Sequence, residues 1–227
     1  MQYIPKVFHQ IWINKENPDL PEKYTKYRDS WLALHPDWSY QLWNLDNLPF
    51  KTRFSNQLAQ CTNYAQMADI LRYEILYELG GVYIDTDFEC RKSIEPLLKD
   101  VRNFSCSEDG RTISIGLVGA EKNSKIMEQC IINMPKVVGL TVPTKETGPA
   151  FFTYAILNHG FNGDLTLFPR EYFYPYNWNE THRESEEFPN AYGIHRWAAS
   201  WNNETKTLRS RLWFRFNHIK NKIFNDK

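Results

Sequence analysis

The sequence lacks an excess of charge of either sign, and it lacks any long hydrophobic run. Its 227 residues include 27 lysines and arginines and 27 aspartates and glutamates, so the formal net charge is zero. A general nucleic-acid-binding protein draws much of its affinity from an overall basic field, and this class is therefore disfavoured. No stretch approaches the ~20 apolar residues that a membrane-spanning helix needs. The first residues also lack the basic and apolar regions of a secretory signal, which favours a cytoplasmic protein.

Cysteine is scarce, and its spacing fits neither a metal finger nor a disulfide scaffold. The four cysteines are far apart in the sequence and form no C-x-x-C motif (Cys61, Cys90, Cys106 and Cys130). Structural zinc sites need closely spaced ligand pairs, and disulfide-dense frameworks belong to small secreted domains. We therefore expect four free thiols in a reducing compartment.

The composition of the chain is that of a folded protein. Hydrophobic residues make up 42% of the chain and charged residues 24%, which is typical of a globular domain and not of a disordered segment. Aromatic residues reach 15%, with 8 Trp and 13 Tyr. Such an excess fits either stacking on sugars and bases or a crowded core, so it does not decide the activity.

Hydrophobic periodicity and turn residues predict alternating strands and helices. Apolar runs predict strands over residues 4–13, 38–42, 82–84, 113–119 and 191–195. Helical spacing and end signals predict helices over residues 21–34, 63–79 and 124–133, and another after residues 147–149. This order predicts an α/β fold with a mainly parallel sheet. We find no internal repeat and no linker, and we expect a single catalytic domain over residues 1–205.

Two aspartates stand one residue apart, directly after a predicted buried strand. Ligands bind at the carboxyl ends of parallel strands, where Asp85 and Asp87 suit a hard cation such as Mg²⁺ or Mn²⁺. The motif alone is weak evidence, because Asp residues often cap turns. The preceding predicted helix carries Asp69 and Arg72 three residues apart. That pair fits either an exposed ion pair or a polar face directed at the same edge of the sheet.

Four sequence blocks, taken in order, resemble a known enzyme family. Residues 68–87 read ADILRYEILYELGGVYIDTD and are similar to the signature of glycosyltransferase family 32. This is the group with a DXD-containing sugar-binding region, and it includes yeast-type initiating mannosyltransferases and bacterial capsule enzymes. IPKVFHQIW at residues 4–12 resembles the first strand of the family. TGP at residues 147–149 and YGIHRWAASW at residues 192–201 resemble two later blocks.

The resemblance implies a fold, a donor and a stereochemistry. It implies a Rossmann-like GT-A fold, a UDP- or GDP-sugar donor, a divalent cation (Mn²⁺ or Mg²⁺) and retention of the anomeric configuration. The large clostridial glucosylating toxins are similar over the same core. Their pattern implies that Asp69 and Arg72 hydrogen-bond the donor-sugar hydroxyls and that Asp85 contacts the sugar and the ribose.

The same pattern implies contacts to the nucleotide and the metal. Trp12 is expected to stack on the base, and Ser200 and Trp201 are expected to contact the diphosphate. Asp87 is expected to ligate the metal directly, with His195 as a further metal or phosphate contact. Without the resemblance, Trp12 fits a core tryptophan and His195 fits a hydrogen-bonded core histidine.

The carboxyl-terminal residues 206–227 form a separate segment in composition. They carry seven lysines and arginines against one acid, and apolar residues recur at helical intervals. A basic amphipathic helix of this type can lie on an anionic membrane surface, which would place the protein at the inner face of the membrane. It can equally dock on the body of the protein with its charged side in water.

These observations predict a retaining, metal-dependent glycosyltransferase that moves a hexose to a cell-surface or lipid-linked glycan. One alternative is the same chemistry on a protein acceptor. A metal-dependent phosphodiesterase or nucleotidyltransferase would need further acidic ligands or a basic phosphate groove, and the sequence offers neither near the two aspartates. A non-catalytic sugar-binding module is the remaining alternative. The donor sugar and the acceptor are not readable from the sequence.

Overall fold

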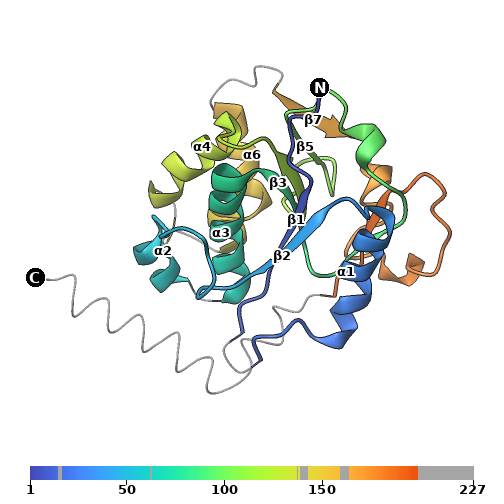
Figure 1. Ribbon diagram of the computed structural model, residues 1–227, viewed down its shortest axis with the longest axis horizontal. Coiled ribbons are helices and arrows are strands. Elements are labelled where there is room, and N and C mark those ends of the chain that lie inside the picture. Colours follow the sequence, from blue (N-terminus) through green and yellow to red (C-terminus); the bar gives the residue numbers. More distant parts are fainter. Residues whose placement is uncertain (15–16, 62, 137, 139–142, 159–163, 199–227) are drawn as a thin grey trace, which may run out of the picture.

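A six-stranded sheet forms the centre of the molecule (Figure 1). The computed structural model describes residues 1–14, 17–61, 63–136, 138, 143–158 and 164–198. The sheet has the order β2-β1-β3-β6-β5-β7, with β1 (Val7–Ile11), β2 (Ser39–Trp43), β3 (Gly81–Ile84), β5 (Asn103–Cys106), β6 (Leu117–Ala120) and β7 (Leu165–Phe168). β6 is antiparallel to its neighbours β3 and β5, and the other strands are parallel to one another. The predicted α/β fold with a mainly parallel sheet is confirmed.

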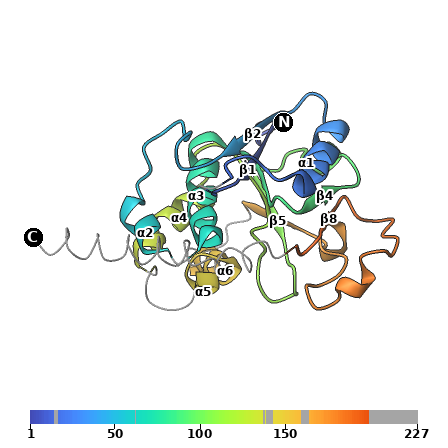
Figure 2. The same ribbon diagram turned by 90° about the horizontal axis from the view of Figure 1, so that it is seen from below.

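Helices cover both faces of this sheet. The described helices are α1 (Glu22–Leu34), α2 (Ser55–Gln60), α3 (Tyr64–Leu79), α4 (Lys125–Asn133), α5 (Pro143–Glu146) and α6 (Pro149–Asn158), with short 3₁₀ turns at Glu95–Leu97, Met134–Lys136, Arg170–Tyr172 and Thr181–Arg183. Figures 1 and 2 show α2, α3, α4 and α6 together on one side of the sheet. α1 lies on the other side, beside a second, two-stranded sheet made of β4 (Phe88–Cys90) and β8 (Gly193–His195).

The side chains of β3 alternate between the two faces of the sheet, and each face packs against its own hydrophobic cluster. Val82 and Ile84 point to the cluster that contains Trp31 of α1. Tyr83 points the other way, into the cluster formed by α3, α4 and α6. All four residues of β3 are buried, as expected for a central strand between two packed layers. The strand that leads to the two aspartates is therefore held from both faces.

Two glycines make the tight passage from α3 into β3 possible. Gly80 has φ +68° and Gly81 has φ +99°, in the left-handed region that side chains with a Cβ rarely adopt. A Cβ at Gly81 would lie 2.6 Å from Cγ1 of Val7 and 2.8 Å from Nε2 of His9. α3 begins at the opposite end with Asn63, whose side chain accepts a hydrogen bond from the Gln66 amide.

All the helices and strands predicted in the described part of the chain are present. The structure differs from the prediction in the pairing of one strand and in the presence of additional short elements. The predicted strand at residues 191–195 corresponds to β8, which pairs with β4 and lies outside the main sheet. The sequence prediction missed α2, α5, β4, β5 and β7, which are between three and six residues long. Short strands carry too few residues for a periodic pattern to stand out. Residues 206–227, predicted as a basic amphipathic helix, lie outside the described residues.

The four cysteines are free and buried, so the predicted free thiols are confirmed. Burial raises the pKa of each thiol, to about 12 for Cys90, which makes these side chains poor nucleophiles. In the described part of the chain, no helix has the length and apolar character needed to span a bilayer.

Candidate active site

The Asp85-Thr86-Asp87 turn connects β3 to β4 at the carboxyl end of β3. Its backbone is fixed by several hydrogen bonds. The amide of Asp85 donates to the carbonyl of Gly116 at 2.8 Å, and the carbonyl of Asp85 accepts from the amide of Phe88 at 3.1 Å. The two aspartates are thus presented by a turn of defined conformation.

Two adjacent residues of β1 hold the two ends of β3. His9 is buried, and its Nε2 lies 2.8 Å from the carbonyl oxygen of Gly80, just before β3. Gln10 is also buried, and its amide donates to the carbonyl of Asp85, just after β3, at 3.3 Å. The Tyr40 hydroxyl on β2 donates to Oε1 of Gln10 at 2.8 Å. Successive side chains of a strand point to opposite faces of the sheet. His9 therefore holds the start of β3 from one face, and Gln10 holds the end of β3 from the other face.

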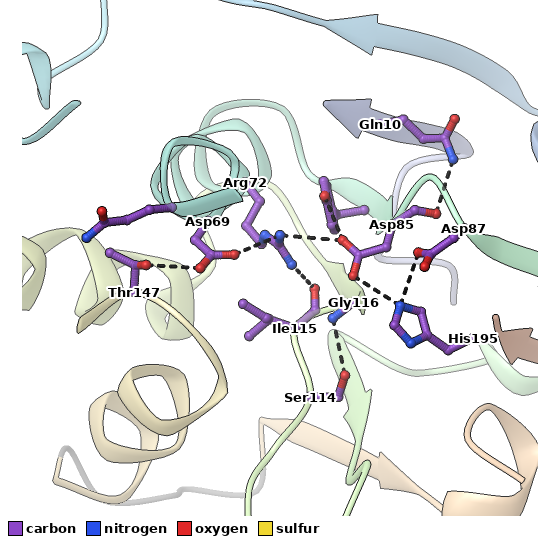
Figure 3. A network of polar contacts seen from close by, with 12 residues as sticks. Gln10, Asp69, Arg72, Asp85, Asp87, Ser114, Ile115, Gly116, Thr147 and His195 are labelled. Atoms are coloured by element: carbon purple, nitrogen blue, oxygen red, sulfur yellow. Dashed lines mark hydrogen bonds and ion pairs between the residues drawn. The ribbon is translucent and has the colours of Figure 1, made fainter. Parts of the chain in front are cut away.

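Asp85, Asp87 and His195 converge at one point (Figure 3). Nε2 of His195 lies 3.2 Å from Oδ1 of Asp87 and 3.6 Å from Oδ2 of Asp85. The pairing of β4 with β8 sets this geometry, because it places Phe88, the residue after Asp87, opposite His195. Two segments more than a hundred residues apart in the sequence therefore build one cluster.

The charges of this cluster shift the pKa values of His195 and Asp85. Burial alone would lower the pKa of His195, but the carboxylates of Asp87 and Asp85 raise it to about 10. Burial would raise the pKa of Asp85, but Arg72, His195 and Tyr83 hold it below its ordinary value. Both shifts have the same meaning: the cluster favours negative carboxylates with a positive charge between them.

The chain that follows β8 closes over Asp87. The amide of Arg196 donates to the carbonyl of Asp87 at 2.9 Å, and the amide of Ala198 donates to its Oδ2 at 2.7 Å. Between them, Trp197 has φ +52°, an unusual conformation for a bulky residue. Its indole packs edge-on against the His195 ring at 4.2 Å between centroids and donates to the carbonyl of Tyr176. Strained backbone of this kind is found preferentially at functional sites.

The Asp69–Arg72 pair of α3 extends the cluster away from His195. Nη2 of Arg72 lies 2.9 Å from Oδ1 of Asp69 and 3.4 Å from Oδ1 of Asp85, and Nη1 donates to the carbonyl of Ile115 at 2.5 Å. The guanidinium also lies over the Tyr83 ring, 4.2 Å from its centroid. Arg72 is only 4% exposed, so the reading as an exposed ion pair is wrong. The polar face of α3 is directed at the Asp85–Asp87 turn.

Asp69 has a second partner on a distant segment. The hydroxyl of Thr147 donates to its Oδ2 at 2.9 Å, and burial raises the pKa of Asp69 to about 6 against the opposing effect of Arg72. Thr147 stands just before α6, and its carbonyl accepts a hydrogen bond from the Tyr73 hydroxyl. The Thr-Gly-Pro block thus meets the DXD block through Asp69.

Gly116 leaves room where a side chain would block the site. A Cβ at this position would lie 2.7 Å from Oδ2 of Asp85 and 2.7 Å from the Tyr174 hydroxyl. Tyr174 in turn is hydrogen-bonded to Ser114 and packs against His195. The lack of a side chain at residue 116 lets the Asp85 carboxylate sit against the start of β6.

The structure brings together five of the predicted site residues: Asp69, Arg72, Asp85, Asp87 and His195. Trp12 is not one of them. It is 8% exposed, lies in a small cluster with Leu20 and Tyr24, and donates its indole N–H to the carbonyl of Asn17. The predicted diphosphate contacts Ser200 and Trp201 lie outside the described residues.

Sequence reasoning missed three residues that position the site, namely Gln10, Gly116 and Tyr174. Gln10 sits in an apolar run, where a polar residue signals a buried hydrogen bond, and this signal was available. Nothing in the local sequence of Gly116 or Tyr174 indicates their place, because each acts through a contact with Asp85 or His195 that only the fold creates.

A divalent cation fits the chemistry of the Asp85-Asp87-His195 cluster. One ligand atom of each residue lies within 4.8 Å of the others, and no other group of three His, Cys, Asp or Glu in the described residues does this. Two carboxylates and an imidazole are suitable ligands for Mn²⁺ and, with more oxygen donors, for Mg²⁺. Nε2 of His195 is the ring nitrogen that faces the two aspartates, so it is the atom that would bind the cation.

Comparison with family models gives a match over residues 21–103. The family is described as the glycosyltransferase sugar-binding region containing a DXD motif. The matched segment includes α3, β3 and the Asp85–Asp87 turn, and so it contains four of the five residues that meet in the site.

Curated relatives extend the likeness beyond that segment. The chain is 34% identical over 164 residues to inositol phosphoceramide mannosyltransferase 3 of Schizosaccharomyces pombe. The aligned segment covers 66% of this chain and 44% of that protein. It is 27% identical over 187 residues to the uncharacterized glycosyltransferase L373 of Acanthamoeba polyphaga mimivirus. Here the aligned segment covers 77% of this chain and 74% of that protein. The chain thus spans less than half the length of the yeast mannosyltransferase that it matches.

Solved structures show the same fold at low sequence identity. The PaToxG glycosyltransferase superimposes with a TM-score of 0.54 at 22% identity, over 69% of this chain and 70% of that one. The UDP-bound glycosyltransferase domain of the YGT toxin gives 0.54 at 10% identity, over 74% and 80%. The galactosyltransferase LgtC, solved with donor and acceptor sugar analogues, gives 0.52 at 10% identity, over 94% and 95%. The predicted GT-A fold is confirmed by these likenesses.

Proposed function

We propose that the protein transfers a hexose from a nucleotide-diphospho-sugar to a glycan or lipid-linked polyol. The premise is that residues 21–103 match the DXD-containing sugar-binding region of glycosyltransferases and that the chain has a GT-A fold. The glycosidic bond between the anomeric carbon and the diphosphate oxygen breaks. A new bond to an acceptor hydroxyl oxygen forms, and the hydroxyl proton passes to the departing nucleoside diphosphate.

One observation carries this proposal. Asp85, Asp87 and His195 offer ligand atoms within 4.8 Å of one another, and Asp85 is joined to the Asp69–Arg72 pair. The first group suits a cation and a diphosphate, and the second suits sugar hydroxyls. A nucleotide-sugar carries both kinds of group on one molecule, and no simpler ligand uses both halves of the cluster.

The chain's own residues have distinct tasks in this proposal. Asp87 and His195 hold the cation, which when bound neutralises charge on the leaving diphosphate. Asp69, Arg72 and Asp85 bind and orient the donor sugar. Nε of Arg72 supports this role, because it is buried and has no hydrogen-bond partner in the described part of the chain. A sugar hydroxyl would satisfy it.

We also propose that the anomeric configuration is retained by attack from the same face as the leaving group. Asp69 and Asp85, the carboxylates of the donor site, are each ion-paired with Arg72. Such pairing lowers the nucleophilicity of a carboxylate. A covalent intermediate on either residue is therefore disfavoured, and the departing diphosphate is left as the group that receives the acceptor proton.

The relatives suggest which donor and acceptor to test first. The yeast relative is named for mannosyl transfer to inositol phosphoceramide. We therefore propose GDP-mannose as the first donor and an inositol phospholipid or a mannose-terminated glycan as the first acceptor. We also propose diphosphate contacts from Ser200 and Trp201, and stacking of the base on Trp12, whose indole lies mostly buried beside Leu20 and Tyr24 in this structure.

Two further proposals concern the place of action. Four buried free thiols fit a reducing compartment, which supports a cytoplasmic location. The basic residues 206–227 are proposed to attach the catalytic domain, residues 1–205, to anionic membranes. Removal of residues 206–227 should then abolish co-sedimentation with anionic vesicles, and unchanged co-sedimentation would contradict the attachment.

The main test is release of nucleotide from a panel of UDP- and GDP-sugars, with Mn²⁺ or Mg²⁺ and with EDTA. We expect release from at least one donor, dependent on the cation, and a loss of at least ~100-fold in Asp87→Asn. Absence of metal-dependent release from every donor, with unchanged donor binding in Asp87→Asn, would overturn the proposal. Products of phosphodiester cleavage from a sugar-free nucleotide would favour the phosphodiesterase alternative.

A further inference from the structure

One carboxyl group at the edge of the sheet that carries Asp85 has no partner. Glu108 stands two residues beyond the end of β5, on the loop that returns to β6. β5 is parallel to β3, so the two strands end at the same edge of the sheet. In the described part of the chain, the carbonyl of Glu108 accepts a hydrogen bond from Nε of Arg170 at 2.9 Å, while its carboxyl group accepts none.

The loop does not need the Glu108 side chain for its own conformation. The Ser107 hydroxyl donates to the carbonyl of Thr112 at 2.8 Å and accepts from the amide of Gly110 at 2.7 Å. The Asp109 carboxylate accepts from the amides of Arg111 and Thr112, both at 2.8 Å. The neighbouring polar side chains thus fix the loop, and the Glu108 side chain is left over.

The environment of this carboxyl group is that of the active site. Glu108 is half-buried, and burial raises the pKa of its carboxyl group. The charge of His195 opposes this rise in the pKa, and the charges of Asp109, Asp85 and Asp69 add to it. A carboxyl group without a partner at the edge of the sheet that carries Asp85 is a candidate for binding a ligand.

The spacing of the sheet separates Glu108 from the donor residues by about one sugar. β6 lies between β3 and β5, and neighbouring strands are ~4.8 Å apart, which gives roughly 10 Å between the ends of β3 and β5. The ends of β3 and β5 are therefore about the length of one hexose apart. Asp69 and Arg72 lie on α3. Glu108 thus follows β5 at the same edge of the sheet as Asp85, apart from the Asp69–Arg72 pair of α3.

On the basis of the proposed function, we infer that Glu108 binds the acceptor, by accepting a hydrogen bond from a hydroxyl group adjacent to the one that attacks. The attacking hydroxyl keeps its single proton for the departing diphosphate. The acceptor class is therefore a polyol with at least two neighbouring hydroxyls, such as a pyranose or an inositol ring. A simple monohydroxylic alcohol lacks the second contact.

The test separates transfer to the acceptor from hydrolysis of the donor. Wild type, Glu108→Ala and Glu108→Gln are assayed with the donor that the panel identifies, Mn²⁺, and either water alone or inositol phosphoceramide micelles or methyl α-mannoside. We expect Glu108→Ala to lower kcat/KM for the acceptor by ~10- to 100-fold, mainly through KM. Hydrolysis of the donor should stay within about twofold of wild type. Glu108→Gln keeps the shape and an accepting oxygen and should lose less.

Glu171→Ala is the matched control, since Glu171 is exposed on the 3₁₀ turn next to Arg170, and it should leave both rates unchanged. Acceptor kinetics within threefold of wild type in Glu108→Ala would overturn the inference. A parallel loss of hydrolysis would also overturn it, because it would place Glu108 on the donor side. If the wild type shows no metal-dependent release from any donor, the proposed function fails, and the role of Glu108 fails with it.

Discussion

Both oxygens of the Asp85 carboxylate are directed by neighbours. Oδ1 accepts from the Tyr83 hydroxyl at 2.9 Å and faces Nη2 of Arg72, and Oδ2 faces His195. The space on the Oδ2 side exists because residue 116 is glycine. The chemistry of this aspartate depends as much on the absence of a methyl group as on the groups that surround it.

Gly116→Ala tests that dependence. A Cβ 2.7 Å from Oδ2 of Asp85 must displace the carboxylate or Tyr174, at a cost of about 1–3 kcal/mol typical of overpacking. We expect metal-dependent nucleotide release to fall by at least ~10-fold while the protein stays folded. The measurement is nucleotide release together with the thermal midpoint.

Gly110→Ala is a control that strains the backbone without a steric clash at the site. Gly110 has φ +77° and nothing within 4 Å of a Cβ, so the variant should lose a little stability and keep its activity. Full activity in Gly116→Ala would mean that the position of the Asp85 carboxylate is less restricted than its contacts indicate.

At the scale of elements, β1 fixes β3 through a neutral histidine. Nε2 of His9 donates to the carbonyl of Gly80, and Nδ1 accepts from the Trp43 indole at 3.0 Å. Burial lowers the pKa of His9 to about 4. The unfolded chain therefore binds a proton on this residue more readily than the folded chain does, so the contribution of His9 to stability is present above pH 6.5 and is lost as the pH falls towards 4.

We expect His9 to account for about 3 kcal/mol of the acid destabilisation in this range. His9→Gln should unfold more easily at pH 7 and show a smaller decrease between pH 6.5 and 4 than wild type. Denaturant titrations at several pH values measure both quantities. His182→Gln, at an exposed position, serves as the control, and an equally steep profile in His9→Gln would show that other groups cause the decrease.

The sequence was sufficient to predict the long elements and four residues of the block at residues 68–87 that meet in the site. α1, α3 and α4 have clear start or end signals, and Asp69, Arg72, Asp85 and Asp87 lie in one continuous segment. The antiparallel direction of β6 and the pairing of β4 with β8 were not predicted, because pairing depends on distant partners and not on local pattern. The role of Glu108 was hidden for the same reason, since a lone acid in a loop has no distinguishing neighbours.

At the scale of the whole molecule, the candidate metal cluster links two sheets. Asp85 follows a strand of the main sheet, and His195 ends a strand of the small one. A cation bound there stabilises the folded chain, because the unfolded chain does not hold these ligands together. At a concentration about 100 times its Kd, the gain is about 2.7 kcal/mol, or a rise of roughly 5–11 °C in Tm for a chain of this size.

We expect Mn²⁺ to raise Tm in wild type and to have little effect in Asp87→Asn, as measured by differential scanning calorimetry with and without EDTA. Asp46→Asn, which changes an exposed acid that is not one of the three cluster residues, should respond to Mn²⁺ like the wild type. A similar rise in Tm in Asp87→Asn would mean that the cation binds elsewhere.

The pairing of β4 with β8 also sets the order in which parts of the chain can fold during protein synthesis. Phe88 leaves the ribosome about a hundred residues before His195, and a chain of that length must close before the pair can form. The α3–β3 unit can fold on the emerging chain, because its contacts are local. The candidate metal cluster cannot, so a nascent or prematurely terminated chain that ends before residue 193 would be expected to fold in part and remain catalytically silent.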